Sequence, residues 1–93
     1  MEYDEDVLEE LHKGSFKNVK KIYKSSYCGC FCCLKEFRPA IIKEYCHDGQ
    51  TAMCPFCGTD SVISSHQGWA INVQLLKQMH KKYFTINGKS IIW

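Results

Sequence analysis

The sequence predicts a small α+β fold, in which short strands surround a group of cysteines and about four helices flank them. Three observations lead to this prediction. The spacing Cys-x2-Cys occurs twice, at Cys30 and Cys33 and again at Cys54 and Cys57, and each pair is typical of a tight turn. Apolar residues recur at helical spacing on both sides of this region. A chain of 93 residues is also marginal on core packing alone, and such chains often recruit a metal or disulfides.

We expect a single domain, because the length suits one domain and neither a linker nor an internal repeat interrupts the chain. The 45% hydrophobic content is that of a globular protein and not of a disordered one. The domain, 1–93, divides into N-terminal helices (1–26), a cysteine-rich core (27–64), a C-terminal helix (65–84) and a tail or hairpin (85–93).

The N-terminal part predicts a first helix that ends near Lys13. Asp4 or Asp6 can cap its start, and Gly14 with Ser15 interrupts it. Its apolar face comprises Val7, Leu8 and Leu11.

A second helix is expected from Phe16 to about Ser25, and it is amphipathic and basic. Its apolar stripe comprises Phe16, Val19, Ile22 and Tyr23. The lysines that face the other way are Lys13, Lys17, Lys20 and Lys24, with Lys21 at the edge.

Beyond the first cysteine pair, Pro39 is suited to the first position of a short helix, which Asp48 and Gly49 end. The buried face of this helix is expected to comprise Ile41, Ile42 and Tyr45. Residues 61–64 have the composition of a short strand, and residues 65–70 that of a loop.

The last helix is expected from about Val73 to Tyr83, with Asn72 as its cap. Its inward residues are Leu75, Leu76, Met79 and Tyr83. In the tail, Asn87-Gly88 lies between two apolar runs, which predicts a hairpin; a frayed tail is the alternative.

The two cysteine pairs predict a tetrahedral zinc site. Twenty residues separate them, and two Cys-x2-Cys turns at this distance can direct four thiolates at one ion, each at about 2.3 Å. Pro55 stiffens the second turn, and Gly58 lets the backbone fold back past it. Iron is the alternative metal, since four thiolates suit it as well. The predicted ligands are Cys30, Cys33, Cys54 and Cys57.

The first half of this site leaves a choice of sulfur, because residues 28–33 contain four cysteines. We prefer Cys30 and Cys33, whose spacing repeats that of the second pair, and Cys28 could replace either of them. Cys32 is expected to be a small buried or half-buried residue, as free cysteine often is.

No enzymatic activity is expected. Four cysteines close a zinc site and leave no position for water, and the sequence lacks the His-x-Glu element of deaminases and other catalytic metal or nucleophile motifs. Cys46, also expected to be buried or half-buried, adjoins His47, but adjacency in sequence is not catalytic geometry. His47 could replace one thiolate; otherwise the histidines are expected to be structural or exposed: His12, His47, His66 and His80.

The cysteine count and the N-terminus favour a cytoplasmic protein. Seven cysteines cannot all pair in disulfides, and reduced cysteines are free to bind metal in the cytosol. The first ten residues are acidic and lack the apolar region of a signal peptide. No apolar run approaches the roughly 20 residues that span a bilayer, so no membrane association is expected.

Charge is unevenly distributed along the chain. Six of the ten acidic residues lie in the first ten positions, whereas all twelve lysines and arginines come later. Residues 11–93 therefore carry twelve positive and four negative side chains, a net charge of +8, which zinc with four thiolates would reduce to about +6. Such a separation fits either a basic binding face or two solvated helix faces.

Three stretches resemble a family of short bacterial proteins known as "cytoplasmic proteins". They are Cys-Gly-Cys-Phe-x-Cys-Leu at 28–34, Thr-Ala-Met-Cys-Pro-Phe-Cys-Gly-Thr-Asp-Ser-Val-Ile at 51–63, and Leu-Leu-Lys-Gln-Met-His at 75–80. The resemblance covers about 20–84 and implies a zinc-ribbon-like site with helices around it, but no activity. The chain departs from the family where Cys32 replaces an expected aromatic residue and where the tail, 85–93, extends it.

These observations favour a protein-interaction module with a protein partner, one version of which is an immunity or antitoxin-like inhibitor. The alternative is a nucleic-acid-binding zinc ribbon that uses the basic helix, 13–24. Only one arginine, Arg38, is present, and arginine dominates base readout, so such binding would be non-specific. A third hypothesis is an enzyme or metal-transfer protein, in which Cys28, Cys32 and Cys46 are labile ligands.

Overall fold

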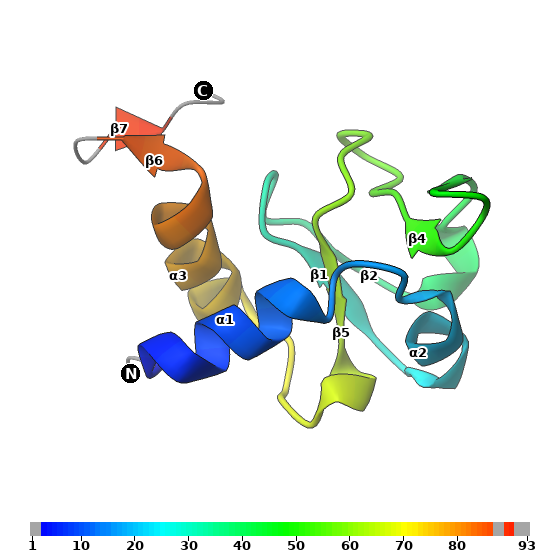
Figure 1. The fold of residues 1–93 in the computed structure, drawn as a ribbon, viewed down its shortest axis with the longest axis horizontal. Helices are drawn as coiled ribbons and strands as arrows, with labels where there is room; N and C mark the ends of the chain where they lie inside the picture. Colours follow the sequence, from blue (N-terminus) through cyan, green and yellow to red (C-terminus); the bar gives the residue numbers. More distant parts are fainter. Residues whose placement is uncertain (1–2, 87–88, 91–93) are drawn as a thin grey trace.

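The computed structural model describes residues 3–86, 89 and 90, and in that part of the chain it is a mixed helical and sheet structure (Figure 1). The α-helices are α1 (Glu5–Lys13), α2 (Val19–Lys24) and α3 (Val73–Tyr83), and the 3-10 turns are η1 (Pro39–Ile41) and η2 (Ser65–Gln67). The strands are β1 (Cys28–Cys30), β2 (Glu36–Phe37), β3 (Tyr45–Cys46), β4 (Thr51–Ala52), β5 (Val62–Ser64), β6 (Thr85–Ile86) and β7 (Lys89–Ser90). The expected small mixed fold with short strands is confirmed, but the described residues form three α-helices where about four were expected. No helix in this part of the chain has the length and hydropathy needed to cross a membrane.

A three-stranded antiparallel sheet in the order β2-β1-β5 forms the centre of the molecule. Figure 1 shows α1 and α3 to one side of this sheet, and α2 with β4 to the other. Strand β1 separates two apolar clusters, because successive side chains of a strand point to opposite faces. Cys28 and Cys30 belong to the cluster that includes Ile22 of α2, whereas Gly29 faces α3. A Cβ atom on Gly29 would lie within 2.9 Å of the Leu76 side chain, so glycine lets α3 approach the sheet closely.

The helix expected from Pro39 to about Asp48 is wrong in its second half. Only the start of this helix forms, as the 3-10 turn η1. The chain then enters an antiparallel hairpin in which β3 pairs with β4. His47, Asp48 and Gly49 all have positive φ, at 54°, 58° and 78°, which a helix does not allow and a tight hairpin turn requires. Ile41, expected to be buried, is 41% exposed, whereas Ile42 is buried as predicted.

The second helix is shorter than expected, since α2 begins only at Val19. Lys17 precedes it with φ of 51°, so the chain turns here and Phe16 does not join the helix. Of the predicted apolar stripe, Ile22 is fully buried, but Phe16 and Tyr23 are exposed.

Asn18, which the sequence did not single out, anchors this turn to the rest of the fold. Its side chain is 1% exposed. Its Nδ2 donates to the main-chain oxygen of Val62 at 2.9 Å, and its Oδ1 accepts from the main-chain nitrogen of Ala52 at 2.9 Å. One amide therefore ties the start of α2 to both β4 and β5.

The C-terminal helix follows the prediction. The Asn72 side chain accepts a hydrogen bond from the Leu75 nitrogen at 2.9 Å, as an N-cap does, and Leu76 and Met79 are fully buried. After α3, strand β6 pairs with β7, as the hairpin prediction for the tail requires. The turn residues of that prediction, 87–88, and the end of the tail, 91–93, lie outside the described residues.

Candidate metal centre

The first cysteine turn follows β1 and folds back on itself through main-chain hydrogen bonds around Cys30. The Leu34 nitrogen donates to the Cys30 oxygen at 2.9 Å, and the Cys30 nitrogen donates to the Lys35 oxygen at 3.0 Å. The Cys32 nitrogen points at the Cys30 sulfur, at 3.3 Å. A main-chain N–H directed at sulfur favours the thiolate, which is the form that binds metal.

The second turn repeats this arrangement around Cys54, at the same offsets. The Gly58 nitrogen donates to the Cys54 oxygen at 2.9 Å, and the Cys54 nitrogen donates to the Thr59 oxygen at 2.8 Å. The Phe56 nitrogen lies 3.4 Å from the Cys54 sulfur. Pro55 lies within the turn, at a position whose N–H this pattern does not use. The two Cys-x2-Cys segments are thus structurally equivalent.

The fourth residue after each first cysteine has a left-handed backbone in both turns. In the second turn it is Gly58, at φ of 78°, which the sequence analysis predicted as a permissive position. In the first turn it is Leu34, at φ of 66°, where a side chain costs about 1 kcal/mol or more. Leu34 packs against the apolar cluster beneath α3, which offsets that cost.

The two turns face each other and bring the four predicted cysteines into one group. Their sulfur atoms all lie within 4.8 Å of one another. The closest approaches join one turn to the other: Cys30 to Cys57 at 3.6 Å, and Cys33 to Cys54 at 3.6 Å. None of the four forms a disulfide.

This group fits a single metal ion. In a tetrahedron with metal–sulfur bonds of about 2.3 Å, neighbouring sulfur atoms are about 3.8 Å apart, close to both short separations here. Thiolates suit zinc and iron better than the hard ions magnesium and calcium. All the ligands come from the two turns, so that an ion bound here would link the ends of β1 and β4.

Two hydroxyl groups that sequence reasoning missed lie against these sulfurs. Ser61 is buried, and its Oγ is 3.0 Å from the Cys30 sulfur. Thr59 Oγ1 is 3.1 Å from the Cys57 sulfur and 2.6 Å from Ser61 Oγ. Both residues follow the second turn at alternate positions, so the entry into β5 directs them to the same side. The alternate positions of Thr59 and Ser61 after the second cysteine pair are the sequence signal from which their approach to the sulfurs could have been predicted.

The surroundings act differently on the individual thiols of the metal-free group. Burial raises the pKa of Cys54 to about 11, and it also raises that of Cys33. For the exposed Cys57, burial of part of the side chain acts in the same direction, but hydrogen bonds from Thr59, Cys30 and Cys54 together outweigh it and lower the pKa to about 7. Of these three thiols, Cys57 is therefore the one that ionises most readily before a metal is bound.

The other three cysteines and His47, which the sequence left as possible ligands or free residues, lie outside the four-sulfur group. Cys28 is fully buried in β1, and burial raises its pKa to about 12, as expected for an inert core thiol. Cys32 is buried as expected, and Cys46 is half-buried. His47 does not join the four sulfurs; together with Cys46 it approaches Asp60 instead.

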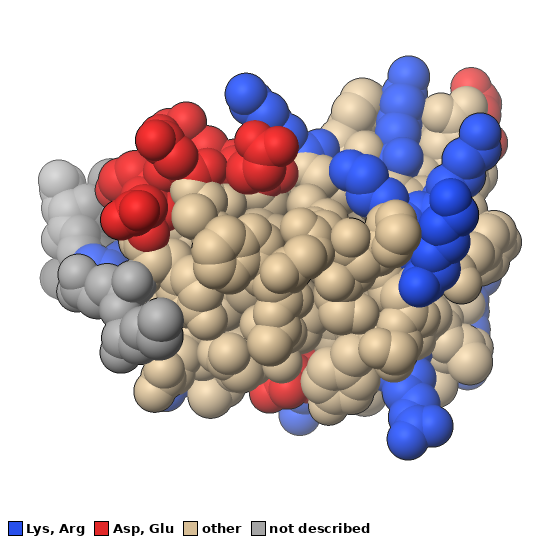
Figure 2. Space-filling model, turned by 90° about the horizontal axis from the view of Figure 1, so that it is seen from below, with Lys and Arg blue, Asp and Glu red and all other residues tan. Residues whose placement is uncertain are grey.

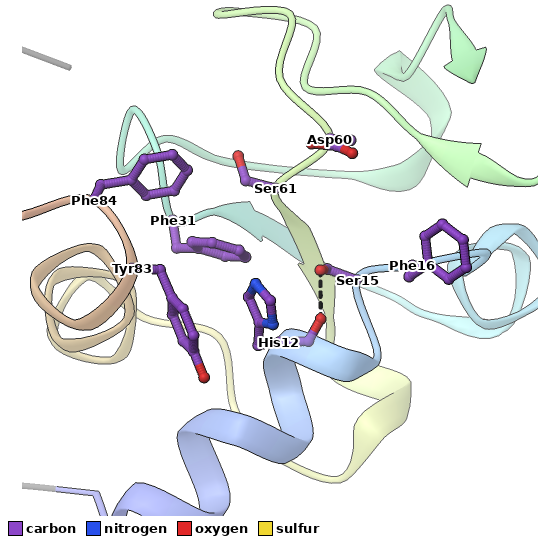
Figure 3. Close-up of a pocket in the computed structure, with 8 residues that line it drawn as sticks. All are labelled: His12, Ser15, Phe16, Phe31, Asp60, Ser61, Tyr83 and Phe84. Carbon is purple, nitrogen blue, oxygen red and sulfur yellow. Dashed lines mark hydrogen bonds between the residues drawn. The ribbon is translucent and has the colours of Figure 1, made fainter. Parts of the chain in front are cut away.

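A hollow of about 320 Å³ opens between the end of α1, the end of α3 and the segment that precedes β5 (Figure 3). His12 stacks on Tyr83 in its wall, with ring centroids 4.0 Å apart, and Phe31 lies beside them. The Ser15 hydroxyl donates to the main-chain oxygen of His12, and not to the imidazole ring. The lining thus presents stacked rings, and the Ser15 hydroxyl makes no hydrogen bond to the His12 imidazole ring.

Comparisons of this chain with protein-family models, curated proteins and solved structures give no match.

Proposed function

We propose that Cys30, Cys33, Cys54 and Cys57 bind one structural zinc ion, and that the protein is a non-enzymatic, cytoplasmic protein-interaction module. The convergence of four sulfurs from two equivalent turns is the observation that carries the zinc proposal. Zinc is the preferred metal, and iron is the alternative for the same ligands. The resemblance to short bacterial proteins with a zinc-ribbon-like site points in the same direction.

The bound ion supplies a tetrahedral cross-link that four protein ligands close. Groups around the ligands stabilise the thiolates: they are the N–H groups of Cys32 and Phe56 and the hydroxyls of Thr59 and Ser61. A site with no open position has no place for a substrate, which supports a structural role and not a catalytic one.

The surface supports a role in binding other macromolecules. Acidic side chains gather over α1 and lysines over the end that contains α2 (Figure 2). The exposed lysines of that end are Lys17, Lys20, Lys21 and Lys24, and none makes an ion pair with another residue in the described part of the chain. Unpaired charge that is segregated in this way favours a partner of complementary charge.

Exposed aromatic side chains lie among these lysines. Tyr23 is 74% exposed and Phe16 is 53% exposed, although both belong to the apolar stripe predicted for the second helix. Tyrosine anchors are enriched in protein interfaces. A protein with an acidic surface is therefore the partner that we propose for the α2 face, and an immunity or antitoxin-like inhibitor is one form that such a module takes.

A nucleic acid is the second candidate partner, and one observation favours it. The acidic residues of α1 lie at the other end of the molecule from α2, so they do not oppose a phosphate at the lysines (Figure 2). Lysines with interleaved aromatic rings are suited to single strands, which they would bind without sequence preference.

Two experiments test these proposals. Elemental analysis of the reduced, purified chain should find tightly held zinc, and its loss in Cys57→Ser would support the ligand assignment. The absence of zinc and iron from the wild-type chain would overturn it.

A titration of labelled single-stranded DNA and RNA at low salt separates the two partner classes. No binding at micromolar protein supports the protein partner. Binding that Lys20→Glu and Lys24→Glu abolish, and that salt weakens steeply, supports the nucleic acid instead.

A further inference from the structure

A second group of metal-ligand side chains lies outside the four-cysteine group. Cys46 ends β3, His47 begins the hairpin turn, and Asp60 lies between the second cysteine turn and β5. Their ligand atoms all lie within 4.8 Å of one another, although the sequence places the third member thirteen residues from the second. Three different ligand types from two segments thus converge at one point.

The backbone of the turn makes this approach possible. Successive residues of a strand point to opposite faces, so Cys46 and His47 would diverge if β3 continued. His47 has φ of 54° instead, and its Nδ1 lies 3.4 Å from the Cys46 sulfur. For sulfur and nitrogen ligands of one tetrahedral ion, a separation of about 3.6 Å is expected.

The imidazole ring is held in this position by its neighbours. His47 Nδ1 lies 3.0 Å from the hydroxyl of the buried Thr51, and the edge of the ring meets Phe16 with centroids 4.9 Å apart. Because the Thr51 hydroxyl and the Cys46 sulfur approach the same ring nitrogen, binding of a metal at Nδ1 would replace the Thr51 bond, and the Phe16 contact would then hold the ring. Asp60 is exposed and makes no ion pair with any residue in the described part of the chain, so its carboxylate is available to a metal ion held by the other two.

We propose that Cys46, His47 and Asp60 form a second, solvent-accessible site for a divalent transition metal ion of the zinc class. One thiolate, one imidazole and one carboxylate carry a net charge of −2, which a divalent ion neutralises. This mixed donor set suits zinc and cobalt, and three protein ligands leave a coordination position for water or an external ligand. The site differs from the closed four-sulfur group in that its ion can exchange with solvent, and it does not depend on the ligand assignment there.

Cobalt(II) titration of the reduced, metal-free full chain tests this proposal. We expect two ions per chain, and the first should give the stronger sulfur-to-cobalt charge-transfer absorption because it binds four thiolates. Cys46→Ser and Asp60→Asn should each weaken the second ion by about 100-fold or more, since even loss of an outer contact to a ligand typically weakens binding 10- to 100-fold. The absorption of the first ion should be unchanged, which also shows that the variants fold.

Asp48→Asn is the matched control, because Asp48 is an exposed carboxylate of the same turn that is not part of the group. It should retain both ions. A single cobalt ion per wild-type chain would overturn the second site and leave the first intact. A second ion that persists at full affinity in both ligand variants would also overturn it. If Cys46→Ser or Asp60→Asn lost the first ion and kept the second, the four-cysteine assignment would be refuted instead.

Discussion

The hydroxyl of Thr59 offers a sharp test of whether side chains around the cysteines tune metal binding. Thr59 Oγ1 lies 3.1 Å from the Cys57 sulfur and 2.6 Å from Ser61 Oγ. The substitution Thr59→Val nearly preserves the shape of the side chain and removes both contacts. The expected result is weaker zinc binding at neutral pH.

The size of this effect follows from the ionisation of Cys57. Part of the side chain is buried, which raises its pKa, but hydrogen bonds from the side chain and main chain of Thr59, and from the Cys30 and Cys54 thiols, prevail and lower it from 9.0 to about 7. At pH 7 about half of these thiols are ionised, against about 1% at the ordinary pKa. Because the metal binds the thiolate, loss of the entire shift would weaken the apparent affinity about 50-fold. Thr59→Val removes only the side-chain bond and leaves the main-chain bond of residue 59 and the bonds from Cys30 and Cys54 in place. Cys57 is exposed, so water replaces part of the lost bond, and we expect about tenfold.

The pH dependence gives this prediction its sign. Since the pKa is lowered in the folded chain, the advantage of the wild type is present at pH 7 and vanishes above pH 9, where Cys57 is ionised in both proteins. Competition with a chromogenic chelator at pH 7 and pH 10 measures both affinities, with Ser26→Ala, at an exposed position outside the four-sulfur group, as a control. Equal affinities at pH 7, or the same deficit at both pH values, would refute this reasoning.

Further predictions concern stability and the remaining cysteines. Chelation should remove on the order of 10 kcal/mol of folding free energy and unfold the chain, as followed by circular dichroism, and Cys54→Ser should unfold it without a chelator. Cys28→Ala should leave the zinc content unchanged by elemental analysis, since Cys28 lies outside the four-sulfur group. Asn18→Ala should destabilise the zinc-loaded protein by about 2–4 kcal/mol in urea, because two buried main-chain groups of β4 and β5 lose their partner; an unchanged midpoint would contradict the anchoring role. Gly29→Ala should destabilise it by about 1–3 kcal/mol, because the added methyl group overlaps side chains facing β1.

Local patterns in the sequence predicted the elements whose structure is locally determined. The C-terminal helix is one of these, because its Asn72 cap and its apolar spacing act within one helix. The cysteine turns are another, since the Cys-x2-Cys spacing and Gly58 describe a backbone shape that forms within six residues. That the two turns lie together was predicted from the expectation that four thiolates share one metal ion.

The hairpin after Pro39 was misread because two signals overlap there. Pro39 and the isoleucines that follow favour a helix, and Asp48-Gly49 suits either a helix end or a hairpin turn. The pairing of Tyr45 with Ala52 decides between them, and that contact is not visible in either segment alone.

Residues that act across the fold could not be found from local patterns. Asn18 bonds to main-chain groups 34 and 44 residues away, and nothing near it in sequence distinguishes it from an ordinary helix cap. Phe16 and Tyr23 fit a helical stripe, but α2 is too short and turned too far to bury them. The approach of Asp60 to the turn at His47 likewise depends on how two loops pack.

X-ray absorption at the zinc edge, on the reduced full chain loaded with one equivalent of zinc, tests the central claim most directly. The proposed assignment predicts four sulfur neighbours at about 2.3 Å and no nitrogen or oxygen in the first coordination shell. A shell with two or fewer sulfurs, completed by nitrogen or oxygen, would show that the four cysteines do not hold the ion together.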